Sequence, residues 1–364
     1  MNNMELKMNN SRIHKLQELL IKRHLQGLLV TNLYNLRYLC GFSGSSGVLL
    51  VLANRAQFFT DFRYQEQCKE ELPKAVKVSI VKKELLREFI ENQSVRRLKN
   101  IGFESCDLRY AQYRQFKKLL RKIRLVPLGN FVENLRGKKD KTEIEKIRQA
   151  AKIADRTFVT ILTFIKPGMN EIDLATEIDY QIRKYGAEKP SFEPIVASGF
   201  KGALPHAKPT NKKIKKGELI VLDLGANYQG YCSDMTRTVI LGKPTKRQRE
   251  IYELVLSAQK AGLAAVKDGE KAAEVDRKAR LIIEKAGYGR NFGHGLGHGI
   301  GLEVHEMPGV SSRSEKILEE GMVVTIEPGV YIPQWGGVRI EDSVVVRKEG
   351  AEILTKSPKE MIVL

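Results

Sequence analysis

The chain has 364 residues, 42% of them hydrophobic and 29% charged, with 30 glycines and 12 prolines. These proportions are typical of a globular protein and exclude a disordered or fibrous chain. At about 150 residues per domain, the length predicts two domains.

The net charge of +19 is the one unusual total. A strongly basic surface attracts polyanions, so nucleic-acid binding has to be weighed. Lysine and arginine, however, occur in pairs along the whole chain, as at Lys117–Lys118, Lys138–Lys139 and Lys215–Lys216, and form no single stripe interleaved with aromatic residues. We therefore expect solvated charged faces and no nucleic-acid partner.

The sequence also bears on location. Its amino-terminal segment lacks a basic stretch followed by an apolar run and a cleavage site, and no stretch reaches the roughly 18 apolar residues of a membrane span. A cytoplasmic protein without a membrane partner is the expectation. Cys40, Cys68, Cys106 and Cys232 show no CxxC spacing, so we expect free, partly buried thiols and no cysteine-based zinc site.

The first third of the chain alternates helical and strand patterns. Residues 11–24 carry apolar residues at helical spacing after Ser11, a candidate N-cap, and predict an amphipathic helix. Short apolar runs bounded by Gly, Asn and Ser predict strands. The expected strands are 27–31, 47–52, 56–60 and 100–103, and further helices are expected around 85–89 and over 110–123. This alternation indicates a compact α/β domain.

The polar, basic stretch 132–141 (VENLRGKKDK) is typical of a linker, so we place the domains at 1–131 and 132–364. The second domain begins with two helical patterns, 142–165 and 171–185, and then changes to strands separated by Gly-rich turns. Strands are expected at 218–224, 230–241, 322–326 and 338–346, and helices at 246–267 and 272–286. Helices combined with antiparallel-looking strands predict an α+β domain.

Residues 220–240 (IVLDLGANYQGYCSDMTRTVI) contain the first chemically informative pattern. A hairpin turning near Tyr228 and Gln229 would place Asp223 and Asp234 roughly opposite each other, about 5 Å apart on one face. Two carboxylates so placed in an apolar setting repel unless a proton or a cation joins them. A single strand aspartate is equally explained as a turn residue or an edge charge, so this pair alone leaves both interpretations open.

Two further acids favour the cation. Glu327 ends an apolar strand pattern (VVTIEPGVYI), and Glu341 lies within another (GGVRIEDSVVV). A carboxylate in a β-branched run seldom stays buried without a partner. Between these acids and the hairpin, residues 293–306 (GHGLGHGIGLEVHE) hold three of the chain's six histidines, and neutral imidazole is a ready metal ligand.

Other chemistries are excluded by their motifs. The sequence HEMPG lacks the second histidine of HExxH, since Gly309 occupies that position. The glycine run is not followed by GKS or GKT, and no GxSxG elbow occurs. One histidine with four carboxylates forms a hard, oxygen-rich ligand set that favours manganese. Two such ions, about 3.5 to 4 Å apart, would share a water and polarise a carbonyl, which is the chemistry of amide hydrolysis.

At this point the sequence resembles the pita-bread metallopeptidase family, which includes aminopeptidase P, prolidase and methionine aminopeptidase. The resemblance covers nearly the whole chain. The motifs that carry it, in the family's order and approximate spacing, are SFEPIVASG (191–199), PHAKPT (205–210), VLDLGANYQGYCSDMTRT, GHGLGHGIGLEVHE, IEPGVY and GGVRIEDS. It implies an α+β fold, with a curved antiparallel sheet flanked by helices in the C-terminal pita-bread domain and a smaller α/β creatinase-like domain before it.

The resemblance also implies roles for individual residues. The implied metal ligands are Asp223, Asp234, His298, Glu327 and Glu341, with Asp234 and Glu341 bridging two divalent ions. Manganese is the expected ion, and cobalt or zinc are alternatives. His206 and His305 resemble histidines that contact the substrate carbonyl or the tetrahedral intermediate, and His294 resembles one that lines the pocket. Arg339 resembles an outer partner that orients a bridging carboxylate, a role we rank above a surface salt bridge.

The N-terminal segments VTNLYNLRYLCGFSGSSGVLLVL and FFTDFRYQEQ resemble the extra domain of the prolidase and aminopeptidase P branch, which commonly forms dimer contacts. The branch implies a homodimer and cleavage between an N-terminal residue and proline in short peptides, by attack of a bridging hydroxide, with Glu327 passing a proton to the proline nitrogen. Two alternatives stay open: an inactive pita-bread binding module, and a metal-free creatinase-like C–N hydrolase.

Overall fold

A computed structural model describes residues 3–82 and 84–364. The chain divides into two compact units, Met1–Arg136 and Gly137–Leu364, and each is described by itself. No helix within the described ranges combines the length and apolar character that a membrane crossing requires.

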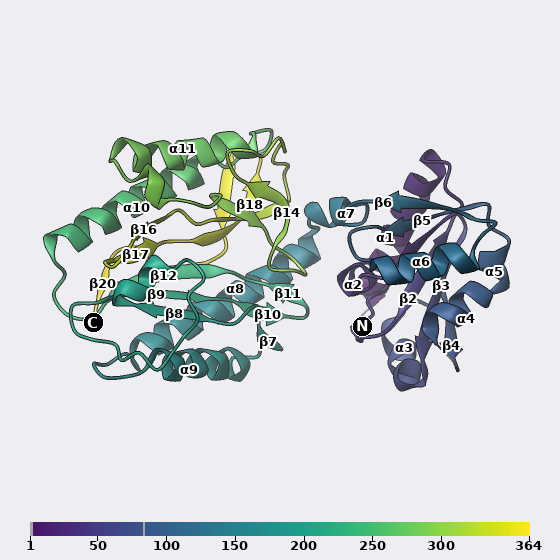
Figure 1. The fold of residues 1–364 in the computed structure, drawn as a ribbon, viewed down its shortest axis with the longest axis horizontal. Helices are drawn as coiled ribbons and strands as arrows, with labels where there is room; N and C mark the ends of the chain where they lie inside the picture. Colours follow the sequence, from purple (N-terminus) through teal and green to yellow (C-terminus); the bar gives the residue numbers. More distant parts are fainter. Residues whose placement is uncertain (1–2, 83) are drawn as a thin grey trace. The chain divides into compact units, whose positions relative to one another are not determined.

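The N-terminal unit contains a six-stranded mixed sheet with the order β4-β3-β2-β1-β5-β6 (Figure 1). Its strands are β1 (Gly27–Val30), β2 (Val48–Leu52), β3 (Arg55–Asp61), β4 (Val76–Val81), β5 (Asn100–Glu104) and β6 (Arg124–Leu128), and its helices are α1 (Asn3–Lys22), α2 (Leu33–Cys40), η1 (Phe62–Tyr64), α3 (Gln65–Glu71), α4 (Leu85–Glu91), α5 (Gln93–Arg96) and α6 (Tyr110–Leu119). Phe89 packs edge-on against both Phe59 and Phe116 in the core. The four strands expected in this unit are confirmed, as is its α/β class.

Two expectations for this unit were wrong. Helix α1 begins at Asn3, well before Ser11, so Ser11 lies inside the helix and does not cap it. The preceding residues Met4, Glu5 and Leu6 are good helix formers, which explains the earlier start. The stretch 132–141 is not an open linker, because it contains helix α7 (Glu133–Gly137) and the buried residues Val132 and Lys139.

The C-terminal unit places its strands between two pairs of helices (Figure 1). Helices α8 (Lys141–Leu162) and α9 (Glu171–Lys184) lie on one side, and α10 (Lys246–Ala265) and α11 (Ala272–Lys285) lie on the other. Helix α8 starts with a capping box in which Asp140 accepts from the backbone N–H of Glu143, and Glu143 reaches back to Asp140. The helices expected here are confirmed with small shifts at their ends.

The strands of this unit form four sheets, which confirm the α+β class. Their orders are β11-β10-β7, β20-β12-β9-β8, β14-β13-β15-β18-β19 and β16-β17. The strands are β7 (Lys189–Pro190), β8 (Ile195–Ser198), β9 (Leu219–Leu224), β10 (Ala226–Tyr228), β11 (Tyr231–Cys232), β12 (Met235–Ile240), β13 (Gly297–Gly299), β14 (Glu306–Val310), β15 (Val323–Ile326), β16 (Gly329–Ile332), β17 (Gly336–Arg339), β18 (Asp342–Arg347), β19 (Gly350–Ile353) and β20 (Ile362–Val363), and the short helices are η2 (Gly199–Ala203) and η3 (Gly289–Asn291). The expected strand 338–346 is two strands, β17 and β18, interrupted at Ile340 and Glu341.

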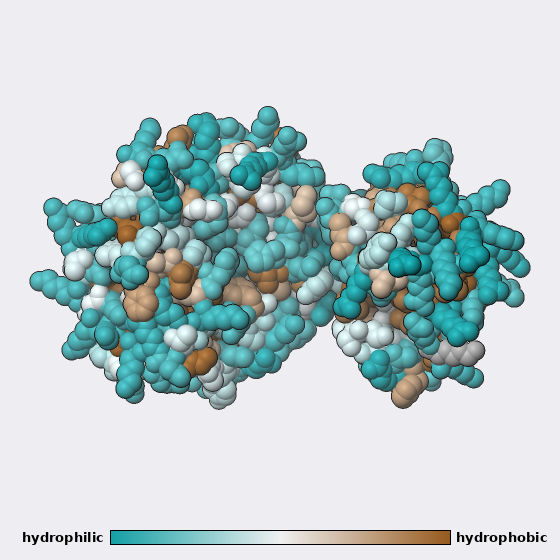
Figure 2. All heavy atoms as spheres, in the orientation of Figure 1, coloured by the Kyte–Doolittle hydropathy of each residue, from teal (hydrophilic) through white to brown (hydrophobic). Residues whose placement is uncertain are grey.

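Two apolar clusters anchor this unit on opposite sides of the sheets. One joins α8 and α9 to β9 and β12 through residues such as Phe158, Ile178 and Leu222. The other joins α10 and α11 to β15 and β18 through residues such as Val255 and Val344. Outside these cores, Figure 2 shows hydrophilic residues over most of the visible face, with apolar residues in small groups. The four cysteines are free, and of these only Cys106 is exposed.

Candidate metal centre and substrate cavity

A cavity of about 440 Å³ lies in the C-terminal unit. Every site residue predicted from the sequence lines it: His206, Asp223, Asp234, His294, His298, His305, Glu327, Arg339 and Glu341. These side chains come from segments up to 135 residues apart, counted from His206 to Glu341. Their convergence is a fact of the fold, while the role of each one stays a prediction.

The hairpin that carries the two aspartates turns where expected, since Tyr228 pairs with Tyr231 and Gln229 adopts a left-handed conformation (φ 49°). The register differs slightly from the expected one. Asp223 pairs with Thr236, so Asp234 lies one diagonal step away and not directly opposite. A step of two residues along a strand keeps a side chain on the same face, and both carboxylates therefore line the cavity.

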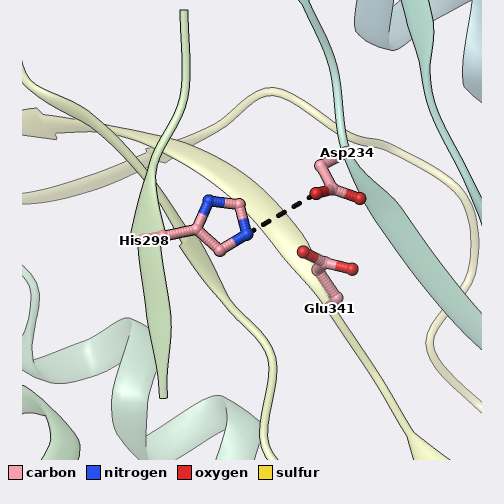
Figure 3. A group of neighbouring side chains, drawn as sticks. All are labelled: Asp234, His298 and Glu341. Carbon is pink, nitrogen blue, oxygen red and sulfur yellow. Dashed lines mark ion pairs between the residues drawn. The ribbon is translucent and has the colours of Figure 1, made fainter. Parts of the chain in front are cut away.

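Asp234, His298 and Glu341 form the centre of the cluster, with ligand atoms that all lie within 4.8 Å of one another (Figure 3). Asp234 immediately precedes β12, His298 lies in β13, and Glu341 lies between β17 and β18. The three side chains point toward a common space in Figure 3. His298 Nε2 lies 3.6 Å from Asp234 Oδ2 and 3.3 Å from Glu327 Oε1, so Glu327 adjoins the same group.

The buried carboxylates of this cluster destabilise one another's charge. Burial and the neighbouring acids raise the pKa of Asp234 and Glu341 well above the ordinary values. The pKa of Asp223 is also raised, chiefly by burial and despite the adjacent Arg339. Glu327 differs: burial would raise its pKa, but the hydrogen bond to His298 and the charges of His298, His294 and Arg339 together outweigh burial and lower it. Three acids held in this way require protons or a cation.

Two carboxylate oxygens indicate that the site is suited to a cation and not only to protons. Asp223 Oδ1 and Glu341 Oε1 are buried and receive no hydrogen bond from the described part of the chain. A buried acceptor without a donor is costly, and a divalent cation would supply the missing partner to both. Carboxylate oxygens with one imidazole are a donor set that such ions bind readily. The residues present therefore fit a metal centre.

Arg339 is buried in this cluster, with 4% of its side chain exposed, so the surface salt bridge considered for it is excluded. Its Nη2 donates to Asp223 Oδ2 at 2.6 Å, and its Nε donates to Thr236 Oγ1 at 3.0 Å. Thr236 Oγ1 donates in turn to Glu341 Oε2 at 2.7 Å. The guanidinium thus fixes one carboxylate directly and a second through a hydroxyl, but one cation cannot balance four acids.

Tyr331 was not among the predicted site residues, although it ends the quoted motif IEPGVY. Arg339 Nη1 lies 3.0 Å from its hydroxyl, and His294 Nε2 lies 2.9 Å from the same atom. Burial raises the pKa of Tyr331 to about 12, so the hydroxyl keeps its proton. Tyr331 pairs with Gly337 across β16 and β17, and this hairpin brings it beside the cluster.

The remaining histidines lie around the cavity. Burial lowers the pKa of His294, which favours the neutral imidazole beside Tyr331. The ring of His305 lies 4.3 Å from the ring of His298, centroid to centroid, and its pKa is lowered by burial and by that neighbour. His206 is exposed at the cavity wall. Of the three, His294 already has both ring nitrogens engaged, by the carbonyl oxygen of Gly295 and the hydroxyl of Tyr331.

An ion pair outside the cavity holds the loop that precedes β13. Arg280 of α11 pairs with the fully buried Asp276 at 2.7 Å and donates to the carbonyl oxygens of Phe292 and His294 at 2.9 and 2.7 Å. Asp276 Oδ1 accepts from the backbone N–H of Leu296 at 3.0 Å. Sequence analysis missed this pair, because an i,i+4 Asp–Arg pair in a helix is usually a surface feature.

Glycines allow strand β13 to fit between its neighbours. A Cβ atom on Gly297 would lie 1.9 Å from the carbonyl oxygen of Thr325, and one on Gly299 would lie 2.4 Å from that of Met307. No side chain can be accommodated at such distances without displacing backbone. The glycines around His298 therefore serve close packing between strands.

Comparisons with known proteins agree with this geometry. Residues 145–348 match metallopeptidase family M24, and residues 12–137 match the Creatinase/Prolidase N-terminal domain. The chain is 44% identical to the uncharacterized peptidase YqhT of Bacillus subtilis, over 97% of this chain and 100% of the relative. It is 39% identical to the Xaa-Pro dipeptidase of Pyrococcus horikoshii, over 97% of this chain and 99% of the relative.

Solved structures similar to this chain also include enzymes named for Xaa-Pro substrates. An Xaa-Pro dipeptidase from Bacillus anthracis has a TM-score of 0.94 at 43% identity, covering 98% of this chain and 100% of the other. An X-Pro aminopeptidase from Thermotoga maritima has a TM-score of 0.90 at 36% identity, covering 97% of this chain and 99% of the other.

Proposed function

Since this chain belongs to metallopeptidase family M24, we propose that it hydrolyses the peptide bond between an N-terminal residue and a following proline. The observation that carries the proposal is the convergence of four carboxylates and His298 on one cavity, where two buried oxygens have no donor. The Xaa-Pro specificity is supported by relatives of both branches, named Xaa-Pro dipeptidase and X-Pro aminopeptidase.

The five residues that would hold two divalent ions are Asp223, Asp234, His298, Glu327 and Glu341. Asp234 and Glu341 would each serve both ions, a role that the family resemblance implies and that suits their place in the central group of the cluster. Manganese is the ion that this oxygen-rich set favours, with cobalt or zinc as alternatives.

When bound, such a pair of ions lowers the pKa of water and polarises the scissile carbonyl. The chain's own residues would do the rest. Burial would raise the pKa of Glu327, but His298, His294 and Arg339 together lower it, so Glu327 would be a carboxylate that accepts a proton and passes it to the proline nitrogen. His206 and His305 line the cavity and would donate hydrogen bonds to the substrate carbonyl. Arg339 holds Asp223 in place, and Tyr331 fixes the neutral His294.

Removal and return of metal tests this function. We expect hydrolysis of Gly-Pro and Arg-Pro-Pro to disappear on dialysis against a chelator and to return with manganese. Activity that survives the chelator, with no metal found by elemental analysis, would leave the metal-free hydrolase. Metal binding without hydrolysis of either peptide would support a binding module.

We also propose that the chain is a homodimer located in the cytoplasm. The support for the dimer is the N-terminal domain, which matches the Creatinase/Prolidase N-terminal domain over residues 12–137. Light scattering should then give twice the chain mass of 41.2 kDa, and a monomer would contradict this part of the proposal.

A further inference from the structure

Two charged side chains line the cavity apart from the buried cluster: Glu193 and Lys208. Both are exposed. The other cationic group of the cavity wall is Arg339, whose guanidinium is already bound to Asp223, Tyr331 and Thr236. Glu193 would repel an anion. Among the lining residues that the structure describes, Lys208 therefore has the one charged ammonium group able to receive one.

The backbone of Lys208 is held firmly. Its carbonyl oxygen accepts from Lys201 Nζ at 2.8 Å, and Lys201 is paired with the fully buried Glu171 at 2.8 Å. Thr210 Oγ1 donates to the same carboxylate at 3.0 Å. The segment is thus tied to one buried acid at Lys208 itself, through Lys201, and at Thr210, two residues further on.

The side chain of Lys208, unlike its backbone, has no partner among the described residues. No ion pair or hydrogen bond to its ammonium occurs within the described chain, while neighbouring Lys201 and Lys212 are both paired. Lys208 follows the buried Ala207, and His206 precedes it, so His206 and Lys208 reach the same cavity from one short segment. An anchored backbone with an unpaired ammonium is suited to binding an anion.

An Xaa-Pro dipeptide has one anionic group, the carboxylate of its proline, one residue beyond the scissile bond. In the metal-loaded protein two divalent ions would balance the four acids of the cluster, so the ammonium group of Lys208 is the positive charge of the wall that remains for this group. Building on the proposed function, we infer that Lys208 recognises the free proline carboxylate of a dipeptide and so gives this chain a preference for dipeptides over longer peptides. In a tripeptide the carboxylate lies about 3.5 Å further along the chain, out of register with Lys208.

Kinetics with matched substrates test this inference. The manganese-loaded protein should have a lower KM for Ala-Pro than for Ala-Pro-amide or Ala-Pro-Gly. The variant Lys208→Met keeps the length of the side chain and removes its charge. It should raise the KM for Ala-Pro by about tenfold, leave its kcat unchanged, and leave the KM for Ala-Pro-amide unchanged. Lys208→Arg should restore most of the preference.

Lys213→Met is the matched control, because Lys213 is exposed on the same segment and does not line the cavity. It should leave all three substrates unaffected. Equal effects of Lys208→Met on Ala-Pro and on the amide would indicate a structural role and overturn the inference. An unchanged KM for Ala-Pro would overturn it as well.

Binding separates this inference from the proposed function. Titration calorimetry of the metal-loaded protein with L-proline and L-prolinamide requires no turnover. Tighter binding of proline, lost in Lys208→Met and regained in Lys208→Arg, supports the carboxylate contact even if no peptide is cleaved. Equal binding of proline by the original protein and by Lys208→Met would refute the contact even if Ala-Pro is cleaved.

Discussion

Glu341 and Asp342 are adjacent buried acids with opposite surroundings. Asp342, on the side away from the cavity, receives hydrogen bonds from Arg237, Lys359, Gln259 and Thr355, all at 2.7 or 2.8 Å. Burial would raise its pKa, but the two cations outweigh burial and lower it. Glu341 faces the cavity, where burial and other acids raise its pKa and Oε1 has no donor.

This difference distinguishes a charge that stabilises the fold from one kept for function. The same fold that gives Asp342 a full set of donors leaves its neighbour with a single hydroxyl, Thr236. An uncompensated buried charge costs several kcal/mol, so such a group persists where a ligand completes it. The two faces should therefore respond in opposite ways to removal of charge.

The largest effect is expected for Glu341→Gln. If Glu341 bridges two ions as proposed, its loss should remove metal binding and reduce kcat/KM by more than about a hundredfold, since even outer partners of metal ligands cost about 10- to 100-fold. The metal-free chain should be at least as stable as before, because one of several repelling acids is gone. Elemental analysis measures the metal content, Ala-Pro hydrolysis gives kcat/KM, and chemical denaturation gives the stability. Asp234→Asn should behave alike, and two retained ions with full turnover would contradict the assignment.

The opposite face should lose stability. Arg237→Met removes the main partner of Asp342 and should lower the free energy of unfolding by about 3 to 5 kcal/mol, because a buried carboxylate loses its ion pair. Lys359→Met is a milder control, since the Lys359 side chain is 19% exposed. Urea denaturation measures the free energy of unfolding of both variants. A loss below about 1 kcal/mol in Arg237→Met would show that the pairing around Asp342 contributes little.

Glu104 in the N-terminal unit is an intermediate case that sharpens the comparison. It accepts from the backbone N–H groups of Thr31 and Asn32 at 2.7 and 2.8 Å and from Asn35 Nδ2 at 2.6 Å. These neutral donors do not offset burial, and the pKa of Glu104 is raised to about 7. Donors without a cation thus leave a buried acid only partly compensated.

A raised pKa means that the folded chain binds the Glu104 proton more tightly than the unfolded chain. The free energy of unfolding should therefore fall as pH rises from 4.5, the ordinary value, to about 7, and should level off above that. The loss is at most about 3 kcal/mol. Urea denaturation of the original chain and of Glu104→Gln at several pH values isolates the contribution. The same pH slope in both would show that Glu104 ionises normally.

The sequence predicted those parts of the fold that depend on local pattern. Long amphipathic helices such as α8 and α10 and apolar strands such as β9 were identified, because their periodicity is strong over many residues. Short strands such as β13 and β14 were missed, since the three residues GHG and the five residues EMPGV carry no periodic signal. Helix α2 was missed too, although Asn32 caps it.

The site shows the same division. The acids and histidines were recognisable because each is awkward in its own sequence context or belongs to a quoted motif. Tyr331 was missed although it ends a quoted motif, because only the tertiary fold brings it beside His294. Asp276 and Arg280 were missed because their i,i+4 pairing in a helix does not reveal the backbone groups of His294 and Leu296 that they hold. Register was also beyond local pattern, and it shifted Asp234 to a diagonal position relative to Asp223.

The tight contacts at Gly297 and Gly299 limit how this protein can change through evolution or design. Each glycine is hemmed in by main-chain carbonyl groups, so no substitution there could be absorbed by a rotamer change. Libraries that randomise Gly297 and Gly299 should return mostly chains that fail to fold correctly. Variation in substrate preference must then come from walls with room for side chains, and the exposed positions 193 and 208 are two such places.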